Sequence, residues 1–427
     1  MTAIVGILNR HGIAFAADSA ATHSLAEDKK KISNHANKIF ELSKYHPIGV
    51  AICGGLSFMG LPWEDVIKLY RVKLEKGSFP HVEDYVKDFM LFVRQTILPH
   101  YTEEQKGHLR ILSDGLRNEA INIAKEKLIE SGRDSESIKS SDIFPLLCDK
   151  LNEFIRIYGK AEMKCGKDFE GYGYEEFNQY AGEVLRETIQ DLCSDDQCPE
   201  GFEEIFSQAL YHILVSKFHV YMGTTELIFW GYGEDDFFPS CHSIKISAAF
   251  DGRIRWTDNS YFVVMNSSPA WIVPFAQTDV SNTVVRGVDQ ILREQFSKEA
   301  GVVLEKFKID LANKLEEIGA PGELKDAIVG MDMKPYEDLF TDDMNKYIQA
   351  NYIDKLMETV SFLMKEDLAE MAESLVKMTC LKRHFTTDEE TVGGPVDVAV
   401  ATRGDGFVWI KRKHYFDASI NHHYFER

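Results

Sequence analysis

The sequence TAIVGILNRHGIAFAADSAAT, residues 2–22, decides the fold of this chain. Residues 2–8 and 13–17 are short stretches rich in β-branched and other apolar side chains. Between them, NRHG at 9–12 is typical of a hairpin turn. We therefore expect two antiparallel strands at the start of the chain.

Further strands and two helical blocks follow this hairpin. Residues 38–42 alternate between apolar and polar side chains, and residues 48–53 form a continuous apolar run, which is typical of a strand buried on both faces. Apolar residues recur at intervals of three and four in two later blocks, about 61–220 and 283–380, which predicts helices. The remaining strands are predicted at 226–231, 241–248, 252–256, 260–265, 397–402 and 407–411.

This order of elements is not an alternating series of strands and helices, so it argues against a doubly wound parallel sheet. It favours an α+β fold in which antiparallel sheets carry helices on their outer faces. The sequence has no internal repeat and no low-complexity linker. We therefore expect a single domain over 1–427, with a core of 2–60, 224–268 and 388–412 and with both helical blocks as insertions.

Composition excludes several classes of protein. The 427 residues include 48 Lys and Arg against 68 Asp and Glu, a net charge of −20, which argues against nucleic acid and an anionic membrane surface as partners. The longest apolar runs are too short to span a membrane, and the N-terminus lacks the basic region of a signal peptide.

The cysteines predict a compartment. There are seven, an odd number without framework spacing, which is typical of a protein in a reducing cytoplasm. Cys193 and Cys198 leave a metal half-site as the less favoured alternative.

Thr2 carries the strongest chemical signal. Initiator Met1 is normally removed when the next residue is small, which would leave Thr2 with a free α-amine beside its own hydroxyl. An α-amine has a pKa of about 8, so it can act as the general base for that hydroxyl. Position alone favours the alternative that Thr2 is an ordinary second residue, and the surrounding sequence decides between the two.

Four stretches around Thr2 resemble the catalytic β subunits of the proteasome and their bacterial relatives, which are N-terminal nucleophile (Ntn) hydrolases. They occur in that family's order and at close to its spacing: 2–8 (TAIVGIL), 12–22 (GIAFAADSAAT), 32–40 (ISNHANKIF) and 49–55 (GVAICGG). Segments within 226–246 and 391–409 resemble the family's central hairpin and final strands. The resemblance implies a four-layer αββα sandwich, two antiparallel sheets between helical layers, enlarged here by the helical insertions.

By this resemblance, four residues form the catalytic group. Thr2 matches the nucleophile, Asp18 the family's aspartate, and Gly54 the glycine whose backbone N–H forms the oxyanion hole. Lys38 matches the catalytic lysine when about four extra residues are allowed within 26–31. As a cation, Lys38 would lower the pKa of the Thr2 amine, and Asp18 would hold Lys38 in place. The alternative for Asp18 and Lys38 is a purely structural ion pair. Gly54 has no side chain, so its backbone can approach an oxyanion closely.

The resemblance also implies residues that bind substrate. Thr22 matches the threonine on the strand that pairs with an extended peptide. Ala20 replaces a commonly basic residue on the same strand, and Gly55 completes the glycine pair.

Supporting residues for the amine are implied near the other end of the chain. Glu389 has the offset of a family aspartate that supports the N-terminal amine, and Val392 stands where the family has a serine, a departure from its pattern. For another family serine, placed after the central strands, Ser267 or Ser268 is the candidate.

Together these matches predict hydrolysis of an amide bond in a peptide or protein substrate, through a Thr2 ester acyl-enzyme and without metal or cofactor. A homo-oligomer is implied by the family alone. Two alternatives stay open: an amidase for a small non-peptide substrate on the same fold, and a catalytically inactive self-assembling scaffold, which Val392 favours.

Overall fold

The computed structural model describes residues 2–25, 28–134, 140–160, 167–193, 199–386 and 392–421. The chain has a mixed α/β fold with two five-stranded antiparallel sheets. It divides into two compact units: unit 1 is Met1–Ala36, Val263–Thr402 and Val408–Arg427, and unit 2 is Asn37–Phe262 and Arg403–Phe407. One sheet belongs chiefly to each unit, and each unit carries one of the two helical blocks predicted from the sequence.

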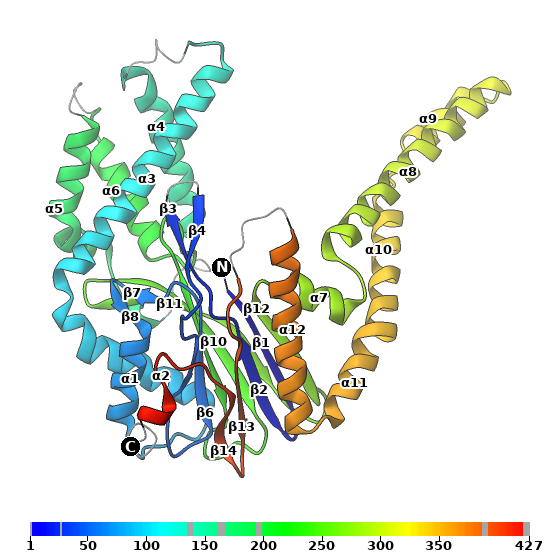
Figure 1. The fold of residues 1–427 in the computed structure, drawn as a ribbon. Coiled ribbons are helices and arrows are strands. Elements are labelled where there is room, and N and C mark those ends of the chain that lie inside the picture. Colours follow the sequence, from blue (N-terminus) through cyan, green and yellow to red (C-terminus); the bar gives the residue numbers. More distant parts are fainter. Residues whose placement is uncertain are drawn as a thin grey trace. The chain divides into compact units, whose positions relative to one another are not determined.

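The sheet of unit 1 is built around the N-terminal hairpin (Figure 1). Its strand order is β12 (Ala270–Ala276), β1 (Ala3–Asn9), β2 (Gly12–Ala17), β13 (Asp397–Thr402), β14 (Gly406–Lys411). The register pairs Asn9 with Gly12 and Ile4 with Ala17, so the predicted hairpin is confirmed. Both faces of β1 and β2 are buried along their whole length.

Helices cover one face of this sheet. α12 (Lys365–Phe385) packs on β1, β2 and β13, and α11 (Asp354–Phe362) packs on β12. Small side chains such as Ala14 and Ala16 face Leu375 and Val376 in this apolar core, which lets α12 approach the strands closely. Asn9 is the last residue of β1 and binds the end of α11. Its Nδ2 donates to the carbonyls of Val360 and Leu363 at 2.8 Å each.

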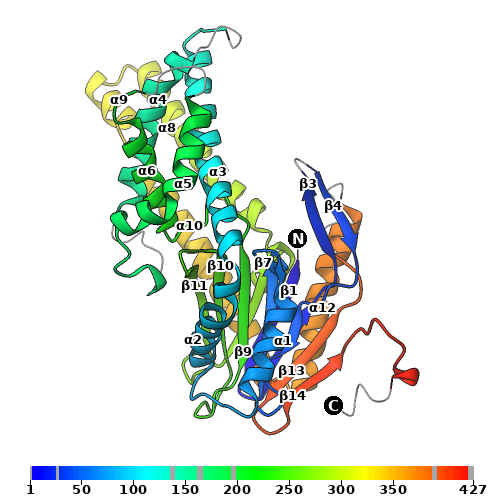
Figure 2. The same ribbon diagram turned by 90° about the vertical axis from the view of Figure 1, so that its left-hand side faces the viewer.

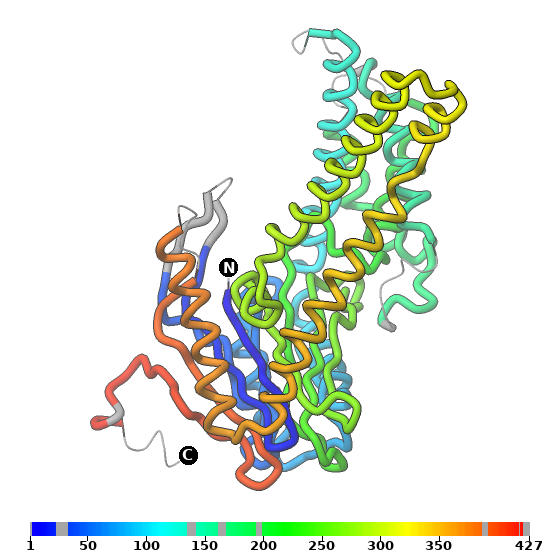
Figure 3. The backbone as a smooth tube through the Cα atoms, turned by 90° about the vertical axis from the view of Figure 1, so that its right-hand side faces the viewer, coloured from blue at the N-terminus to red at the C-terminus, as the bar shows by residue number. Residues whose placement is uncertain are grey.

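An arm of helices continues unit 1 between β12 and α11. It comprises α7 (Asp279–Arg286), α8 (Gln290–Glu317), α9 (Gly322–Val329), α10 (Lys334–Ile348) and the π-helical turn Gln349–Ile353. Figure 3 shows α8 and α10 running side by side beyond the strands of their own unit. The second predicted helical block is therefore confirmed as helical.

A second hairpin in unit 1 was not predicted from the sequence. β3 (Ala21–Leu25) and β4 (Asp28–Ser33) form a two-stranded antiparallel sheet (Figure 2). The charged run DKKK, residues 28–31, lacks the apolar alternation by which strands are recognised, so the pattern of side chains did not reveal β4. Most of the stretch in which the family match needs extra residues belongs to this strand.

The sheet of unit 2 has a different chain order. Its strands run β11 (Arg253–Val263), β10 (Ser240–Phe250), β9 (Thr225–Gly231), β6 (Ile48–Gly54), β5 (Ile39–Glu41). The sequence predicted two strands, at 252–256 and 260–265, where the structure has the single strand β11. Polar residues 257–260 (TDNS) caused that error, because they resemble a turn although they continue the strand. A short pair, β7 (Ser57–Phe58) and β8 (Leu61–Pro62), follows β6.

The first helical block packs into unit 2. Its helices are α1 (Trp63–Leu74), α2 (Val82–Phe92), α3 (Thr102–Glu130), α4 (Ser140–Tyr158), α5 (Tyr174–Leu192) and α6 (Phe202–Leu214). α2 and α3 lie on β10, and α4, α5 and α6 pack with α3. One apolar core joins these helices to the sheet through residues such as Trp63, Phe89 and Phe229.

Candidate functional site

Asp18 joins three segments of unit 1. It follows β2 directly, and its side chain is 1% exposed. Its Oδ1 accepts a hydrogen bond from the N–H of Ala3 at 2.9 Å, and its Oδ2 accepts from Ala20 at 3.1 Å and from Gly393 at 3.0 Å. Hydrogen bonds to an ionised carboxylate are about twice as strong as neutral ones. We call Asp18 and these three backbone partners the Asp18 junction.

Thr2 is held from both sides by its neighbours. The Asp18 junction fixes the N–H of Ala3, and the carbonyl of Thr2 accepts a hydrogen bond from the N–H of Gln277 at 3.2 Å. Thr2 itself is 4% exposed at the start of β1. Gln277 follows Ala276, whose φ of 62° turns the chain out of β12. The sequence did not identify Gln277, because a backbone donor leaves no signal in residue type.

Ser19 connects the same region to two loops. Its N–H donates to the carbonyl of Gly393 at 3.0 Å, and its Oγ donates to the carbonyl of Pro395 at 2.6 Å. Its carbonyl accepts from the N–H of Ala36 at 3.0 Å. Lys38 follows Ala36 by two residues, so the chain alone keeps their Cα atoms within about 7 Å of each other.

The glycine pair 393–394 has a structural reason. Gly393 has a φ of 144° and Gly394 a φ of 79°, both in the region that favours glycine. A Cβ on Gly394 would lie 2.8 Å from the carbonyl oxygen of Asn34. Val392, just before the pair, is 0% exposed in the apolar core of unit 1. Val392 thus contributes its side chain to core packing.

Lys38, Gly54 and Gly55 belong to unit 2. Lys38 is 1% exposed, and its carbonyl accepts from the N–H of Ile52 at 2.8 Å. Gly54 ends β6 with a φ of 87°, and a Cβ there would lie 2.6 Å from the carbonyl oxygen of Thr224. A side chain is therefore excluded at Gly54 by both backbone conformation and space.

Two residues expected to bind substrate have other tasks. The N–H of Gly55 donates to the carbonyl of Thr224 at 3.1 Å, and its carbonyl accepts from Thr225 Oγ1 at 2.8 Å, so the N–H of Gly55 is already used within the protein. Ala20 is 1% exposed and its N–H belongs to the Asp18 junction, so its side chain does not line a cleft. Thr22 lies in β3 opposite Lys31 and is half-buried.

Ser267 and Ser268 lie at the wrong end of β1 to support the Thr2 amine. They belong to the turn before β12, where Met265 and Ser268 exchange backbone hydrogen bonds at 3.0 and 3.1 Å. The register pairs Ala276 with Ala3 and Ala270 with Asn9, so this turn lies beyond the far end of β1, about 20 Å along the strand from Thr2. Glu389, the other predicted supporting residue, lies outside the described residues.

The cysteines depart from the reduced set predicted from the sequence. Among the cysteines that the structure describes, four have free thiols and Cys193 is disulfide-bonded. A sulfur in a disulfide is not a thiolate ligand, so Cys193 does not form the metal half-site considered above. Within the described ranges, no group of three or more His, Cys, Asp or Glu side chains is placed to hold a metal ion.

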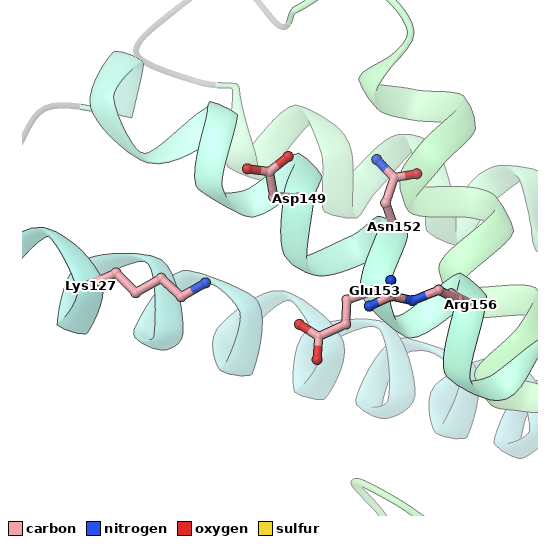
Figure 4. A pocket seen from close by; sticks show the side chains of 5 residues that line it. All are labelled: Lys127, Asp149, Asn152, Glu153 and Arg156. Carbon is pink, nitrogen blue, oxygen red and sulfur yellow. The ribbon is translucent and has the colours of Figure 1, made fainter.

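A polar surface pocket lies in unit 2, between α3 and α4. Figure 4 shows its five lining residues, Lys127 from α3 and Asp149, Asn152, Glu153 and Arg156 from α4. Two cations and two anions line it, so it has little preference for ligand charge. In the described part of the chain, no helix is both long and apolar enough to cross a membrane.

Comparison with models of known protein families and with curated protein sequences finds no match.

Proposed function

We propose that this chain is a threonine-type Ntn hydrolase that cleaves amide bonds, with Thr2 as nucleophile after removal of Met1. One observation carries the proposal: the Asp18 junction and Gln277 fix the backbone on both sides of Thr2 at the buried start of β1. A nucleophile must be held in one geometry to gain from proximity to its base and substrate. A second residue without a role has no need of such fixing.

The chemistry follows from the two groups of Thr2. The α-amine accepts the proton of the Thr2 hydroxyl as Oγ attacks the carbonyl carbon of the scissile amide. The tetrahedral intermediate collapses when the amine passes that proton to the leaving nitrogen, which gives an ester on Thr2 and a free amine product. Water then attacks the ester, the Thr2 amine takes a proton from it, and release of the acid restores the hydroxyl.

Lys38 and Gly54 supply charge stabilisation in this proposal. A buried cation is costly unless an anion or hydrogen-bond acceptors compensate it, so a lysine that is 1% exposed needs a reason. The bond between Ala36 and Ser19, two residues before Lys38, ties this part of the chain to the Asp18 region. By the family resemblance, Lys38 would lower the pKa of the Thr2 amine, and the backbone N–H at Gly54 would donate to the oxyanion.

The four-layer αββα arrangement is part of the same proposal. Strands inside such a sandwich are buried on both faces, and β1, β2 and most of β6 have that burial. Helices cover one face of each sheet, namely α11 and α12 in unit 1 and α2 and α3 in unit 2. In a four-layer sandwich, the face of each sheet that carries no helices is also apolar and buried.

A peptide or protein is the proposed substrate. The hairpin β3–β4 presents Thr22 on an extended strand, and an extended peptide can pair with such a strand through its backbone. Val392, buried in the core, is the observation that favours an inactive scaffold, because it removes one supporting hydroxyl. A small-molecule amidase would differ because it would not hydrolyse unstructured peptides.

Hydrolysis of an unstructured peptide by the full chain tests the proposal. Thr2→Ala should abolish the activity, whereas Thr2→Ser should retain part of it, because serine keeps both the amine and the hydroxyl. Ser267→Ala is the matched control, since its hydroxyl is exposed and lies far from Thr2 along β1; it should leave the rate unchanged. Equal activity of Thr2→Ala and the unaltered chain would refute the proposed nucleophile.

A further inference from the structure

Helix α8 exposes many apolar side chains, and a series of them lies on one side, interrupted there by Asp310 and Lys314. Of its 28 residues, only Gly301 and Ala312 are buried. Six large apolar side chains lie within an arc of about 100° on one side of the helix. They are 40% to 77% exposed, and Ile318 follows the last residue of the helix directly. We call them the α8 stripe: Leu292, Phe296, Val303, Phe307, Leu311 and Ile318.

Within its own unit α8 packs on α9 and α10, and its hydrogen bonds to α10 come from residues outside the stripe. Towards α10, Arg293 donates to Asn345 at 2.9 Å, and Thr341 donates to Ser297 at 3.3 Å. Gly301 lets α10 approach closely, since a Cβ there would lie 2.5 Å from Glu337 Oε1. The seam between α8 and α10 is therefore polar and narrow, and the stripe lies to one side of it.

We propose that the α8 stripe is the contact surface of a homodimer, in which α8 pairs antiparallel with α8 of a second copy. A two-fold axis at the level of Gly301 and Val302 would place Leu292 opposite Leu311 and Phe296 opposite Phe307. Ala300 would face Val303, and each pair would occur twice, as two-fold symmetry requires. The small Ala300 beside the axis allows the helices to approach closely.

Charge along the edge of the stripe fits the same arrangement. Glu299 and Lys306 both flank the stripe on one side and are exposed. In the antiparallel pair, Glu299 of one copy would lie within about 3 Å, measured along the axis, of the level of Lys306 of the other. Two reciprocal ion pairs would result, whereas a parallel arrangement would align like charges. This complementarity selects a second copy over an unrelated partner.

The exposed area is also close to that of a dimer interface. Taking roughly 150–200 Å² for a fully exposed large apolar side chain, the stripe offers roughly 500 Å² of apolar surface. A standard interface buries about 800 Å² on each partner, and about 65% of a homodimer interface is apolar, so about 500 Å² is what such a dimer needs. The stripe supplies most of this amount from the residues that face α8 of the second copy, since Ile318 lies beyond the paired part of the helices.

Sedimentation velocity of the full chain from about 1 to about 100 μM tests the proposal. The unaltered chain should sediment as a dimer at the upper end, and Phe296→Glu with Phe307→Glu should weaken the dimer more than about 100-fold in Kd. Ile309→Glu is the matched control: Ile309 is 54% exposed on the same helix but lies outside the stripe, so the dimer should persist. A monomer at every concentration, or equal loss with Ile309→Glu, overturns the proposal.

A charge swap distinguishes antiparallel self-pairing from any other use of the stripe. Glu299→Lys alone and Lys306→Glu alone should each weaken the dimer about tenfold, because each creates two repulsive pairs. The two changes in one chain should restore it, because the reciprocal pairs re-form with inverted sign. A doubly substituted chain weaker than both single variants overturns the antiparallel arrangement. Circular dichroism checks that all variants keep their helix content.

Discussion

The two longest helices of the molecule, α3 and α8, are nearly equal in length but differ in burial. α3 has 29 residues and buries Leu109, Leu112 and Leu116 against its neighbours in unit 2, where Ser113 also donates to Thr188 at 2.9 Å. α8 has 28 residues and buries only a glycine and an alanine. Apolar composition alone does not separate them. The difference teaches that α3 is buried within its own unit, whereas α8 leaves apolar side chains exposed, which the proposed dimer would bury.

Leu112→Ala should give the largest effect, because it removes a side chain that is 0% exposed in the core of unit 2. We expect a loss of about 3 kcal/mol in the free energy of unfolding, from lost transfer energy and the cavity left behind. Urea unfolding followed by circular dichroism measures it. A loss below about 1 kcal/mol would contradict the claim that α3 is a core helix.

Asp18→Asn tests how much the Asp18 junction contributes to the stability of unit 1. The substitution removes the charge and turns an NH₂ group towards buried N–H donors, so we expect a loss of about 2 kcal/mol in the same unfolding experiment. Asp289→Asn is the matched control: Asp289 also accepts backbone N–H bonds, at the start of α8, but is exposed, and asparagine caps helices well. Equal losses in both variants would remove the special status of the Asp18 junction.

The pH dependence of stability tests whether His219, which follows α6 in unit 2, is buried. Its imidazole lies 2.9 Å from Ser247 Oγ and 3.3 Å from Thr257 Oγ1. Burial, with Arg255 and Lys245 nearby, lowers the pKa of His219 from 6.5 to about 4. The unfolded chain therefore binds a proton between pH 6.5 and about 4 that the folded chain does not, so stability is complete above pH 6.5 and falls as the pH drops through this window.

We expect this group to account for about 1–2 kcal/mol of that loss, because partial exposure weakens the effect. Unfolding measured from pH 4 to pH 7 for the unaltered chain and for His219→Gln isolates it. The gap between the two stabilities should change across the window and stay constant above it. A constant gap throughout would mean that His219 titrates normally.

Leu292→Ala should have the smallest effect. It repeats the Leu112 substitution on α8, where the side chain is 49% exposed, so we expect less than about 1 kcal/mol at concentrations too low for a dimer. At high concentration the loss should grow, because the dimer would bury this residue. A loss as large as that of Leu112→Ala at low concentration would remove the contrast between α3 and α8.

Sequence patterns predicted the local elements well and the connections between them poorly. The hairpin of β1 and β2 and both helical blocks follow from apolar periodicity, which local structure obeys directly. β4 did not follow, because its lysines hide the strand pattern. The exposure of apolar side chains on α8 did not follow either, since a sequence does not show whether an apolar residue is buried within its own chain.

At the candidate site, the structure explains the residue types of some predicted residues and adds contacts that only the backbone makes. Asp18 and Gly54 have residue types that their surroundings demand, a carboxylate for three N–H groups and a glycine for a positive φ. Gln277 acts through its N–H and Gly55 through backbone bonds to its neighbours, so residue type gave no guidance. Ser267 was wrong because the register of β12 on β1, which sequence spacing does not fix, places it at the far end.

The central claim concerns the first atoms of the mature chain, and one measurement addresses it directly. Intact mass spectrometry follows treatment of the full chain with an electrophile that reacts with both the amine and the hydroxyl of an N-terminal threonine. The account predicts the mass of the chain without Met1 plus one adduct, and no adduct on Thr2→Ala. A chain that retains Met1, or one that loses it and remains unlabelled, would contradict the assignment of Thr2 as the nucleophile.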